Sequence, residues 1–103
     1  MTESEYSHLA DATLNRLEAA LDAAEIDYER AGGSILEIEF ADASVIVVNK
    51  QAAAREIWVA AKSGGFHYHW DAAAWRDTRS GEELFTALAR LISAQAGEVV
   101  TLA

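Results

Sequence analysis

The centre of the fold is decided by residues 36–59, which read LEIEFADASVIVVNKQAAAREIWV. Apolar and acidic side chains alternate over residues 36–40, which is the pattern of a strand with one buried face. A turn leads to the β-branched run at residues 45–48, which predicts a second strand, and the polar residues 49–51 are expected to end it. Residues 56–61 predict a third strand, so we expect an antiparallel sheet here.

Three further strands extend this pattern on both sides. Residues 26–29 alternate between apolar and acidic side chains before a glycine turn at residues 32–33. A second turn, at residues 63–65, precedes the aromatic run at residues 66–70. Trp75 marks a short sixth strand.

Helical periodicity is found on either side of the strands. An apolar residue recurs every three or four positions over residues 4–24 and predicts an amphipathic helix. Its apolar stripe consists of Tyr6, Ala10, Leu14, Leu17, Leu21 and Ala24. A second helix is expected after residues 80–83, where Ser80 and Glu83 fit the two ends of a capping box, and Gly97 suits the position after its last turn.

This order of elements predicts a single domain over residues 1–103. The expected class is α+β, a two-layer α-β sandwich in which an antiparallel sheet carries the N- and C-terminal helices on one face. The other face of the sheet is then exposed to solvent. We expect the protein to be a monomer.

The composition restricts the possible chemistry. The chain contains neither cysteine nor proline, which excludes disulfides, thiolate metal ligands and cysteine nucleophiles. No apolar run approaches the length of a membrane span, and the acidic N-terminus lacks the apolar core of a secretory signal, so we expect a cytoplasmic protein. No Ser/His/Asp spacing, glycine-rich phosphate loop or helical histidine pair indicates an enzyme.

Acidic residues are concentrated in the first two-fifths of the chain. The formal net charge is −9, and residues 1–42 hold eleven of the seventeen acids but only two of the eight bases. Such a field disfavours binding to nucleic acid or anionic lipid and attracts cations or a basic protein surface. Charge that only keeps the protein in solution is the alternative interpretation.

One side of the first helix carries the acids suited to metal binding. At about 100° per residue, four of them fall within about 60° of one another. These are Asp11, Glu18, Asp22 and Glu25. Carboxylates are hard oxygen ligands for divalent or ferric cations, but without a cage the affinity is expected to be weak. A solvated helix face is the alternative.

Three histidines are further candidates for metal ligands, and one tryptophan is a candidate for a protein contact. His67 and His69 lie two residues apart in an expected strand, so both imidazoles would share one face, and His8 lies near the acidic end of the first helix. Surface histidines without a metal are the alternative. Strand alternation places Trp58 on the open face of the sheet, where an exposed tryptophan is typical of a protein contact, unless the register shifts by one residue.

The order and spacing of several motifs resemble the frataxin family, in particular its bacterial branch. The motifs are Asn49-Lys50-Gln51, Ile57-Trp58-Val59-Ala60, Gly64-Gly65-Phe66-His67-Tyr68, Trp75 and Arg79-Ser80-Gly81-Glu82, with Glu5-Tyr6-(x)2-Leu9-Ala10-Asp11 and Gln95-Ala96-Gly97-Glu98 near the two ends. The resemblance covers nearly the whole chain. It implies two helices on one face of an antiparallel sheet, and weak binding of iron (Fe²⁺ or Fe³⁺) by surface carboxylates.

By this resemblance, the expected metal ligands are acids of the first helix and the following strand, with the histidines as weaker candidates. They are Glu3, Asp11, Glu18, Asp22, Glu25, Asp27 and Glu29, then His8, His67 and His69. The family pattern carries adjacent acidic pairs, whereas alanine follows both Glu18 and Asp22 here. Weaker iron loading is therefore expected.

The resemblance also implies two protein partners in iron–sulfur cluster assembly, a cysteine desulfurase and a scaffold protein, and no contact with nucleic acid or membrane. The acidic residues would face a basic patch on the desulfurase, and the sheet face around Trp58 would face the scaffold. The expected contact residues are Glu18, Asp22, Glu25, Asn49, Gln51 and Trp58.

Three functions are compatible with these patterns. The first is an iron-binding adapter that regulates cluster assembly and is not an enzyme. The second is a ferroxidase or iron-storage protein, which the missing acidic pairs disfavour because such chemistry uses closely paired carboxylates. The third is a protein-binding module whose iron binding is incidental.

Overall fold

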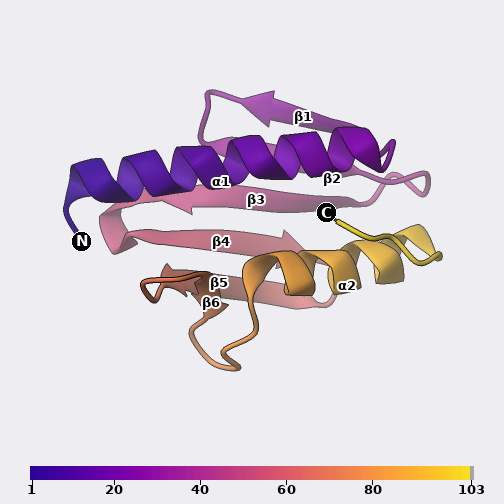
Figure 1. The fold of residues 1–103 in the computed structure, drawn as a ribbon. Coiled ribbons are helices and arrows are strands. Elements are labelled where there is room, and N and C mark those ends of the chain that lie inside the picture. The colour runs from indigo at the N-terminus through magenta and orange to yellow at the C-terminus, as the bar shows by residue number, and fades with distance from the viewer. Residues whose placement is uncertain (103) are drawn as a thin grey trace.

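Two helices cross the same face of a six-stranded sheet in the computed structural model, which describes residues 1–102 (Figure 1). The elements follow in the order α1 (Glu3–Ala23), β1 (Tyr28–Ala31), β2 (Ile35–Glu39), β3 (Val45–Gln51), the 3₁₀ turn η1 (Ala52–Ala54), β4 (Glu56–Ala61), β5 (Gly64–Trp70), β6 (Trp75–Asp77) and α2 (Leu84–Ala96). The predicted two-layer α+β sandwich is confirmed. Over residues 1–102, neither helix combines the length and the apolar character that crossing a membrane requires.

Each strand of the sheet pairs with its neighbours in sequence. The strand order is β1-β2-β3-β4-β5-β6 and every pair is antiparallel. Alternation along each strand sends one set of side chains toward the helices and the other set to the open face. One row of paired residues runs across the sheet through Asn49, Trp58 and His67, so these three side chains share a face.

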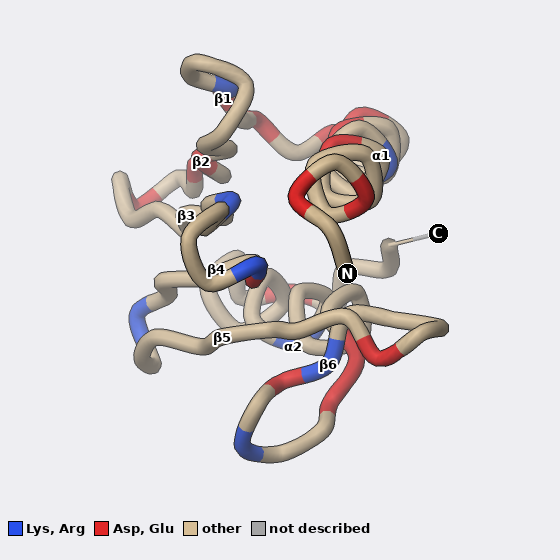
Figure 2. Tube along the Cα trace, turned by 90° about the vertical axis from the view of Figure 1, so that its left-hand side faces the viewer, with Lys and Arg blue, Asp and Glu red and all other residues tan. Residues whose placement is uncertain are grey.

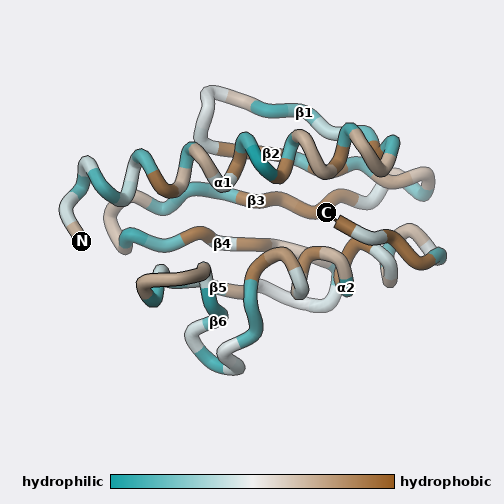
Figure 3. The backbone as a smooth tube through the Cα atoms, in the orientation of Figure 1, coloured by the Kyte–Doolittle hydropathy of each residue, from teal (hydrophilic) through white to brown (hydrophobic). Residues whose placement is uncertain are grey.

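The core lies between the sheet and the helices. From α1, the side chains of the predicted stripe are buried up to Leu21, whereas Ala24 lies just beyond the helix and is half-buried. The sheet and α2 contribute Leu36, Ile38, Ile46, Val48, Ile57, Val59, Leu84, Leu88, Leu91 and Ile92. Figure 3 shows α1 alternating between hydrophilic and hydrophobic segments, whereas β3 is largely hydrophobic. Burying each such Leu, Ile or Val side chain stabilises the fold by about 1.5–3 kcal/mol.

Two hydrogen bonds fix the rotation of α1 on the sheet. Tyr6 Oη donates to the backbone carbonyl of Glu56 at 2.8 Å, and Trp75 Nε1 donates to Thr13 Oγ1 at 2.8 Å. Both donors are aromatic side chains that are almost completely buried. With this side of α1 held against the sheet, its acidic residues are directed toward β1, β3 and solvent.

The start of α2 differs from the prediction. The expected capping box at Ser80 is wrong, because the helix begins at Leu84 and Glu83 is its N-cap. The Glu83 carboxylate accepts two backbone N–H groups of the first turn, at 2.8 and 3.1 Å. Ser80 lies in an earlier turn, where its N–H donates to the carboxylate of Asp77 at 3.1 Å. Gly97 ends the helix with a φ of 74°, as predicted.

Several strand boundaries differ as well, and β1 begins at Tyr28, two residues later than the predicted strand at residues 26–29. The expectation that residues 49–51 end a strand is wrong, because β3 continues through Gln51 in register with β4. The chain reverses at η1 instead, where Arg55 has a φ of 53°. β5 begins at Gly64, which pairs with the last residue of β4, so the turn is shorter than the predicted one.

Candidate functional site

Acidic side chains follow α1 along the side that faces β1 and β3. Spacings of seven and four residues place Asp11, Glu18 and Asp22 in one row, as predicted, and we call these three residues the acidic side of α1. Figure 2, which looks nearly along the axis of α1, shows several acidic segments on this helix. Each of the three carboxylates accepts a hydrogen bond from a side chain of the sheet.

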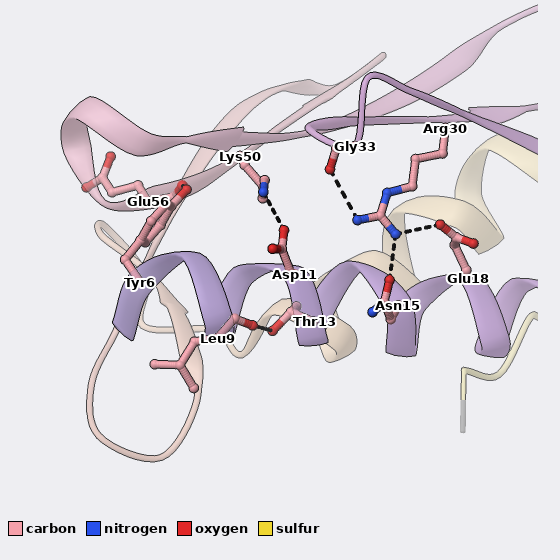
Figure 4. A network of polar contacts seen from close by, with 10 residues as sticks. All are labelled: Tyr6, Leu9, Asp11, Thr13, Asn15, Glu18, Arg30, Gly33, Lys50 and Glu56. Atoms are coloured by element: carbon pink, nitrogen blue, oxygen red, sulfur yellow. Dashed lines mark hydrogen bonds and ion pairs between the residues drawn. The ribbon is translucent and has the colours of Figure 1, made fainter. Parts of the chain in front are cut away.

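Asp11 forms an ion pair with Lys50 of β3 (Figure 4). Lys50 reaches the helix because alternation places it on the same side of β3 as the buried Val48. Its side chain is only 16% exposed, whereas that of Asp11 is 48% exposed. The carboxylate therefore keeps a solvent-accessible surface although its charge is balanced.

Glu18 is held by Arg30 of β1. Arg30 Nη1 donates to Glu18 Oε2 and to Asn15 Oδ1, both at 2.7 Å, and Nη2 donates to the backbone carbonyl of Gly33 at 3.1 Å (Figure 4). The side chains of Arg30 and Glu18 are 20% and 28% exposed. Hydrogen bonds between ionised groups are about twice as strong as neutral ones, and this pair is largely removed from solvent.

Asp22 accepts a hydrogen bond from the hydroxyl of Tyr28 at 2.9 Å. This hydrogen bond raises the pKa of Tyr28, because ionising the phenol would remove the donor and place a second negative charge beside the carboxylate. Unlike Lys50 and Arg30, the tyrosine is neutral at physiological pH. This donor therefore brings no positive charge to Asp22, unlike the donors of Asp11 and Glu18.

Four further acidic residues line a cavity at the C-terminal end of α1. The prediction that Glu25 continues the helical row is wrong, because α1 ends at Ala23 and Glu25 has a φ of 58° in the next turn. Glu25, Asp27, Glu39 and Glu98 line a cavity of about 270 Å³, which we call the acidic cavity. Among the described residues that line it, none is basic.

Two residues of the acidic cavity were not among the predicted ligands. Glu39 is brought there because its backbone N–H donates to the carbonyl of Asp27 at 2.9 Å, which joins the end of β2 to the start of β1. Its place in an alternating strand was visible in the sequence. Glu98 arrives from the far end of α2, and no local sequence signal indicates that it meets the end of α1.

Three predicted ligands lie elsewhere. Glu3 is exposed at the start of α1, and His8 is exposed one turn further along the helix. Glu29 lies directly opposite Glu37 in the β1–β2 pair. Because its two neighbours in β1 contact α1, Glu29 faces the other side of the sheet. The seven predicted acids therefore do not form one site.

On the open face of the sheet, Trp58 stacks on His67. Their ring centroids are 4.2 Å apart and their planes differ by 6°. Trp58 Nε1 donates to Glu56 Oε1 at 2.8 Å, and His67 Nδ1 lies 3.8 Å from the same oxygen. The flanking Ile57 and Val59 are buried, so the predicted placement of Trp58 on the open face is confirmed.

Asn49 and Gln51 extend this surface. Asn49 pairs with Trp58 across β3 and β4, and Gln51 pairs with Glu56 two rows further along, on the same face. We call the surface of Asn49, Gln51, Glu56, Trp58 and His67 the tryptophan platform. A depression of about 220 Å³ lies on it, lined in part by Asn49, Trp58 and His67. The three residues predicted to contact a partner from the sheet therefore lie together.

The acidic side of α1 and the tryptophan platform lie on opposite faces of the sheet. His67 and His69 share the open face, as predicted, so neither is placed to complete a metal site with the acids of α1. Across residues 1–102 there is no group of three or more His, Asp or Glu side chains that could hold a metal ion. Within this part of the chain, no set of protein side chains is therefore arranged in advance as the ligands of a metal ion.

Comparisons with known proteins agree with one another. Residues 1–98 match the family model described as a frataxin-like domain. The chain is 54% identical over 104 residues to the iron-sulfur cluster assembly protein CyaY of Dechloromonas aromatica (strain RCB), covering 99% of each chain. It is 49% identical over 107 residues to the protein of the same name from Cupriavidus metallidurans, covering 99% of this chain and 96% of that one. A solved frataxin from Psychromonas ingrahamii aligns with a TM-score of 0.90 at 32% identity, covering 98% of this chain and 97% of the other.

Proposed function

The chain belongs to the frataxin family, as the sequence motifs indicated, and from this membership we propose that it is an iron-binding adapter in iron–sulfur cluster assembly. Its relatives are named as assembly proteins rather than as enzymes. The observation that carries the proposal is the presence of two different surfaces on opposite faces of one sheet. One surface is acidic and suits cations or a basic protein, and the other presents an aromatic anchor.

Iron is proposed to bind at the acidic cavity. Glu25, Asp27, Glu39 and Glu98 are among the residues that line this cavity, and Asp22 lies at the adjacent end of α1. Carboxylate oxygens are the hard ligands that ferrous and ferric ions accept, and neighbouring negative charge raises the local concentration of cations. Weak, exchangeable binding is expected, which suits an adapter that responds to iron rather than stores it.

The acidic side of α1 and the acidic cavity together form what we call the acidic surface. A cysteine desulfurase is its proposed partner. Glu18, Asp22 and Glu25 would contact a basic patch of the desulfurase, and attraction between opposite charges would raise the association rate at low salt. The scaffold protein is the proposed partner of the tryptophan platform. Trp58, supported by its stacking on His67, would be the central contact, with Asn49 and Gln51 as polar groups at its edge.

The proposal is tested in a reconstituted cluster-assembly reaction that contains desulfurase, scaffold, cysteine and iron. Adding the protein should change the initial rate, and the size of the change should depend on the iron concentration. The variant with Glu25→Gln and Asp27→Gln should lose most of the iron dependence. A control variant with Asp71→Asn and Glu82→Gln removes the same charge near β6 and α2 and should behave as wild type. An unchanged rate with the unmodified protein would contradict the proposal.

A protein-binding module with incidental iron binding is the second candidate. It is favoured by the internal donors that already occupy the carboxylates of the acidic side of α1. For this candidate, the protein would change the assembly rate to the same degree at every iron concentration. The rate of oxygen consumption with ferrous iron distinguishes a ferroxidase from both candidates. A ferroxidase would raise this rate above that of buffer, whereas an adapter should leave it unchanged.

A further inference from the structure

We propose that Tyr6 is a positioning residue of the tryptophan platform: from the opposite face of the sheet, it holds Glu56 in the place where the Glu56 carboxylate orients Trp58. This inference rests on the proposed function, because Trp58 is the proposed contact to the scaffold protein. It adds a buried residue of α1 to a surface that is otherwise formed by the strands β3, β4 and β5.

The Tyr6 hydroxyl reaches the backbone at the edge of the platform. Tyr6 Oη donates to the carbonyl oxygen of Glu56 at 2.8 Å, and Figure 4 shows the two residues side by side. Glu56 pairs with Gln51 across β3 and β4, and this is the last pair before the turn between the two strands. Burial raises the pKa of Tyr6, whereas a hydrogen bond with the backbone of Gln51 opposes that rise. The hydroxyl thus lies close to both members of this pair.

Glu56 accepts hydrogen bonds from two aromatic side chains that lie on opposite faces of the sheet. Its backbone carbonyl accepts from Tyr6 of α1, and its carboxylate accepts from Trp58 Nε1 at 2.8 Å on the open face. His67 Nδ1 lies 3.8 Å from the same carboxylate oxygen, and the imidazole stacks on the indole. A displacement of the Glu56 backbone would therefore move the acceptor of the Trp58 N–H and disturb the stack.

The turn before Glu56 needs support from outside β3 and β4. Arg55, which directly precedes Glu56, has a φ of 53°, a left-handed conformation that is unfavourable for a residue with a Cβ atom. Such a conformation persists only where the surrounding structure holds it. Two contacts from α1 provide this support: Tyr6 binds Glu56, and Asp11 forms an ion pair with Lys50 near the end of β3. The position of Glu56 therefore depends on α1 as well as on the sheet.

Tyr6 is itself held firmly in the core. Its side chain is 2% exposed, and its ring meets that of Trp75 edge to face, with centroids 6.1 Å apart and planes at 86°. Trp75 is in turn held by its hydrogen bond to Thr13 of α1. Packing on these sides leaves the Tyr6 ring little freedom to rotate, and a side chain locked in this way positions a neighbouring group accurately.

The test uses Tyr6→Phe, which removes the hydroxyl and keeps the ring in the core. In NMR spectra of the protein alone, the indole N–H resonance of Trp58 should shift in this variant, because the Glu56 backbone is no longer held. Thr13→Val is the matched control, since it removes a hydrogen bond between α1 and the sheet that does not involve Glu56. This control should shift the indole resonance of Trp75 and leave that of Trp58 in place.

Affinity for the scaffold protein of the reconstituted reaction measures whether this positioning affects binding. Tyr6→Phe should weaken binding at least about twofold, the lower end of the coupling found between neighbouring residues, whereas Thr13→Val should bind as wild type does. In the Glu56→Ala background, Tyr6→Phe should cause no further loss, because the carboxylate through which it acts on Trp58 is absent. Losses that add up in the double variant would show that the hydroxyl acts by another route and would overturn the inference.

The inference is also overturned if the Trp58 indole resonance stays in place in Tyr6→Phe, if Thr13→Val shifts it equally, or if Tyr6→Phe binds the scaffold with wild-type affinity. Its failure is distinguishable from that of the proposed function. If wild type does not bind the scaffold, the proposed function fails, and the indole resonance alone decides whether Tyr6 positions Trp58. If wild type binds but the resonance does not move in Tyr6→Phe, the role of Tyr6 is contradicted and the proposed function stands.

Discussion

The acidic surface and the tryptophan platform are built in opposite ways. On the acidic side of α1, each carboxylate is held by a donor from a strand of the sheet, and four other acidic residues line a cavity beyond the helix. On the platform, Trp58 is held by neighbours on its own and the adjacent strand, through a stacked imidazole and one hydrogen bond to Glu56.

This difference has consequences for binding. Charge acts over about 8 Å at physiological ionic strength, so the acidic surface should attract partners from a distance and lose strength in salt. An aromatic anchor acts through contact and desolvation, so the platform should be insensitive to salt. Two partners with different requirements can therefore bind opposite faces of the same sheet.

The largest effect on binding is expected from a substitution that removes the aromatic anchor of the tryptophan platform. Trp58→Ala should weaken binding to the scaffold by about 2 kcal/mol, or about thirtyfold, because a central aromatic contact is lost. The loss should be the same at low and high salt, as measured by isothermal titration calorimetry. His69→Ala on the same face is the matched control and should change the affinity little. A loss that disappears in high salt would contradict an aromatic anchor.

The second largest effect on binding is expected from reversing charges on the acidic surface. Reversing two charges with Glu25→Lys and Asp27→Lys should weaken binding to the desulfurase about tenfold at low salt, because attraction becomes repulsion. At about 1 M salt the Debye length is only about 3 Å, so the difference from wild type should largely vanish. Association rates at both salt concentrations provide the measurement. An equal loss at both would indicate a misfolded variant or an uncharged contact.

A smaller effect tests how the platform is held together. Glu56→Ala removes the acceptor of the Trp58 indole N–H and should weaken scaffold binding by about 1 kcal/mol, the typical contribution of one hydrogen bond. The indole N–H resonance of Trp58 should shift and broaden, while those of Trp70 and Trp75 stay in place. Unchanged scaffold binding together with a shifted resonance would show that this hydrogen bond does not support the contact.

The smallest effect at neutral pH is expected from substituting Tyr68, which lies on the buried side of the sheet. The quantity affected is the free energy of unfolding and not partner binding. Burial raises the pKa of Tyr68 to about 12. The protonated phenol is thus favoured in the folded state, so its contribution to stability is complete below about pH 10 and is lost as the pH rises through about 12. Tyr68 Oη has no hydrogen-bond partner among residues 1–102, so Tyr68→Phe should change the stability at pH 7 by less than about 1 kcal/mol.

Urea unfolding at several pH values measures this effect. Wild type should lose up to about 3 kcal/mol between pH 10 and 12 through this residue, following the size of the shift in pKa. Tyr68→Phe should remove that part of the loss. Parallel curves for the two proteins over this range would show that Tyr68 does not ionise with unfolding.

Most of the fold could be predicted from the sequence, because its signals are local. The period of the apolar stripe located α1, and residues 56–61 predicted β4 with the observed bounds. The end of β3 was missed, since Asn49 and Gln51 are polar but remain paired with β4. The start of α2 was missed because Asp77 organises a turn at Ser80, which leaves the capping role to Glu83.

The two surfaces were predictable to different degrees. Trp58 was placed correctly because strand alternation is a local rule and the register was right. The pairing of Glu18 with Arg30 links residues 12 apart, and that of Asp11 with Lys50 links residues 39 apart. Such contacts depend on the packing of α1 against the sheet. Periodicity alone predicted one row of four acids on α1. In the structure, three of them accept hydrogen bonds from side chains of the sheet, and the fourth, Glu25, lines the acidic cavity instead.

The central claim, that iron binds weakly at the end of α1 and not on the open face, is tested most directly by an anaerobic ferrous-iron titration followed by amide NMR. The account predicts selective broadening of Glu25, Asp27, Glu39 and Glu98 with little change at Trp58. Broadening centred on His67 and His69, or no selective change up to millimolar iron, would contradict it.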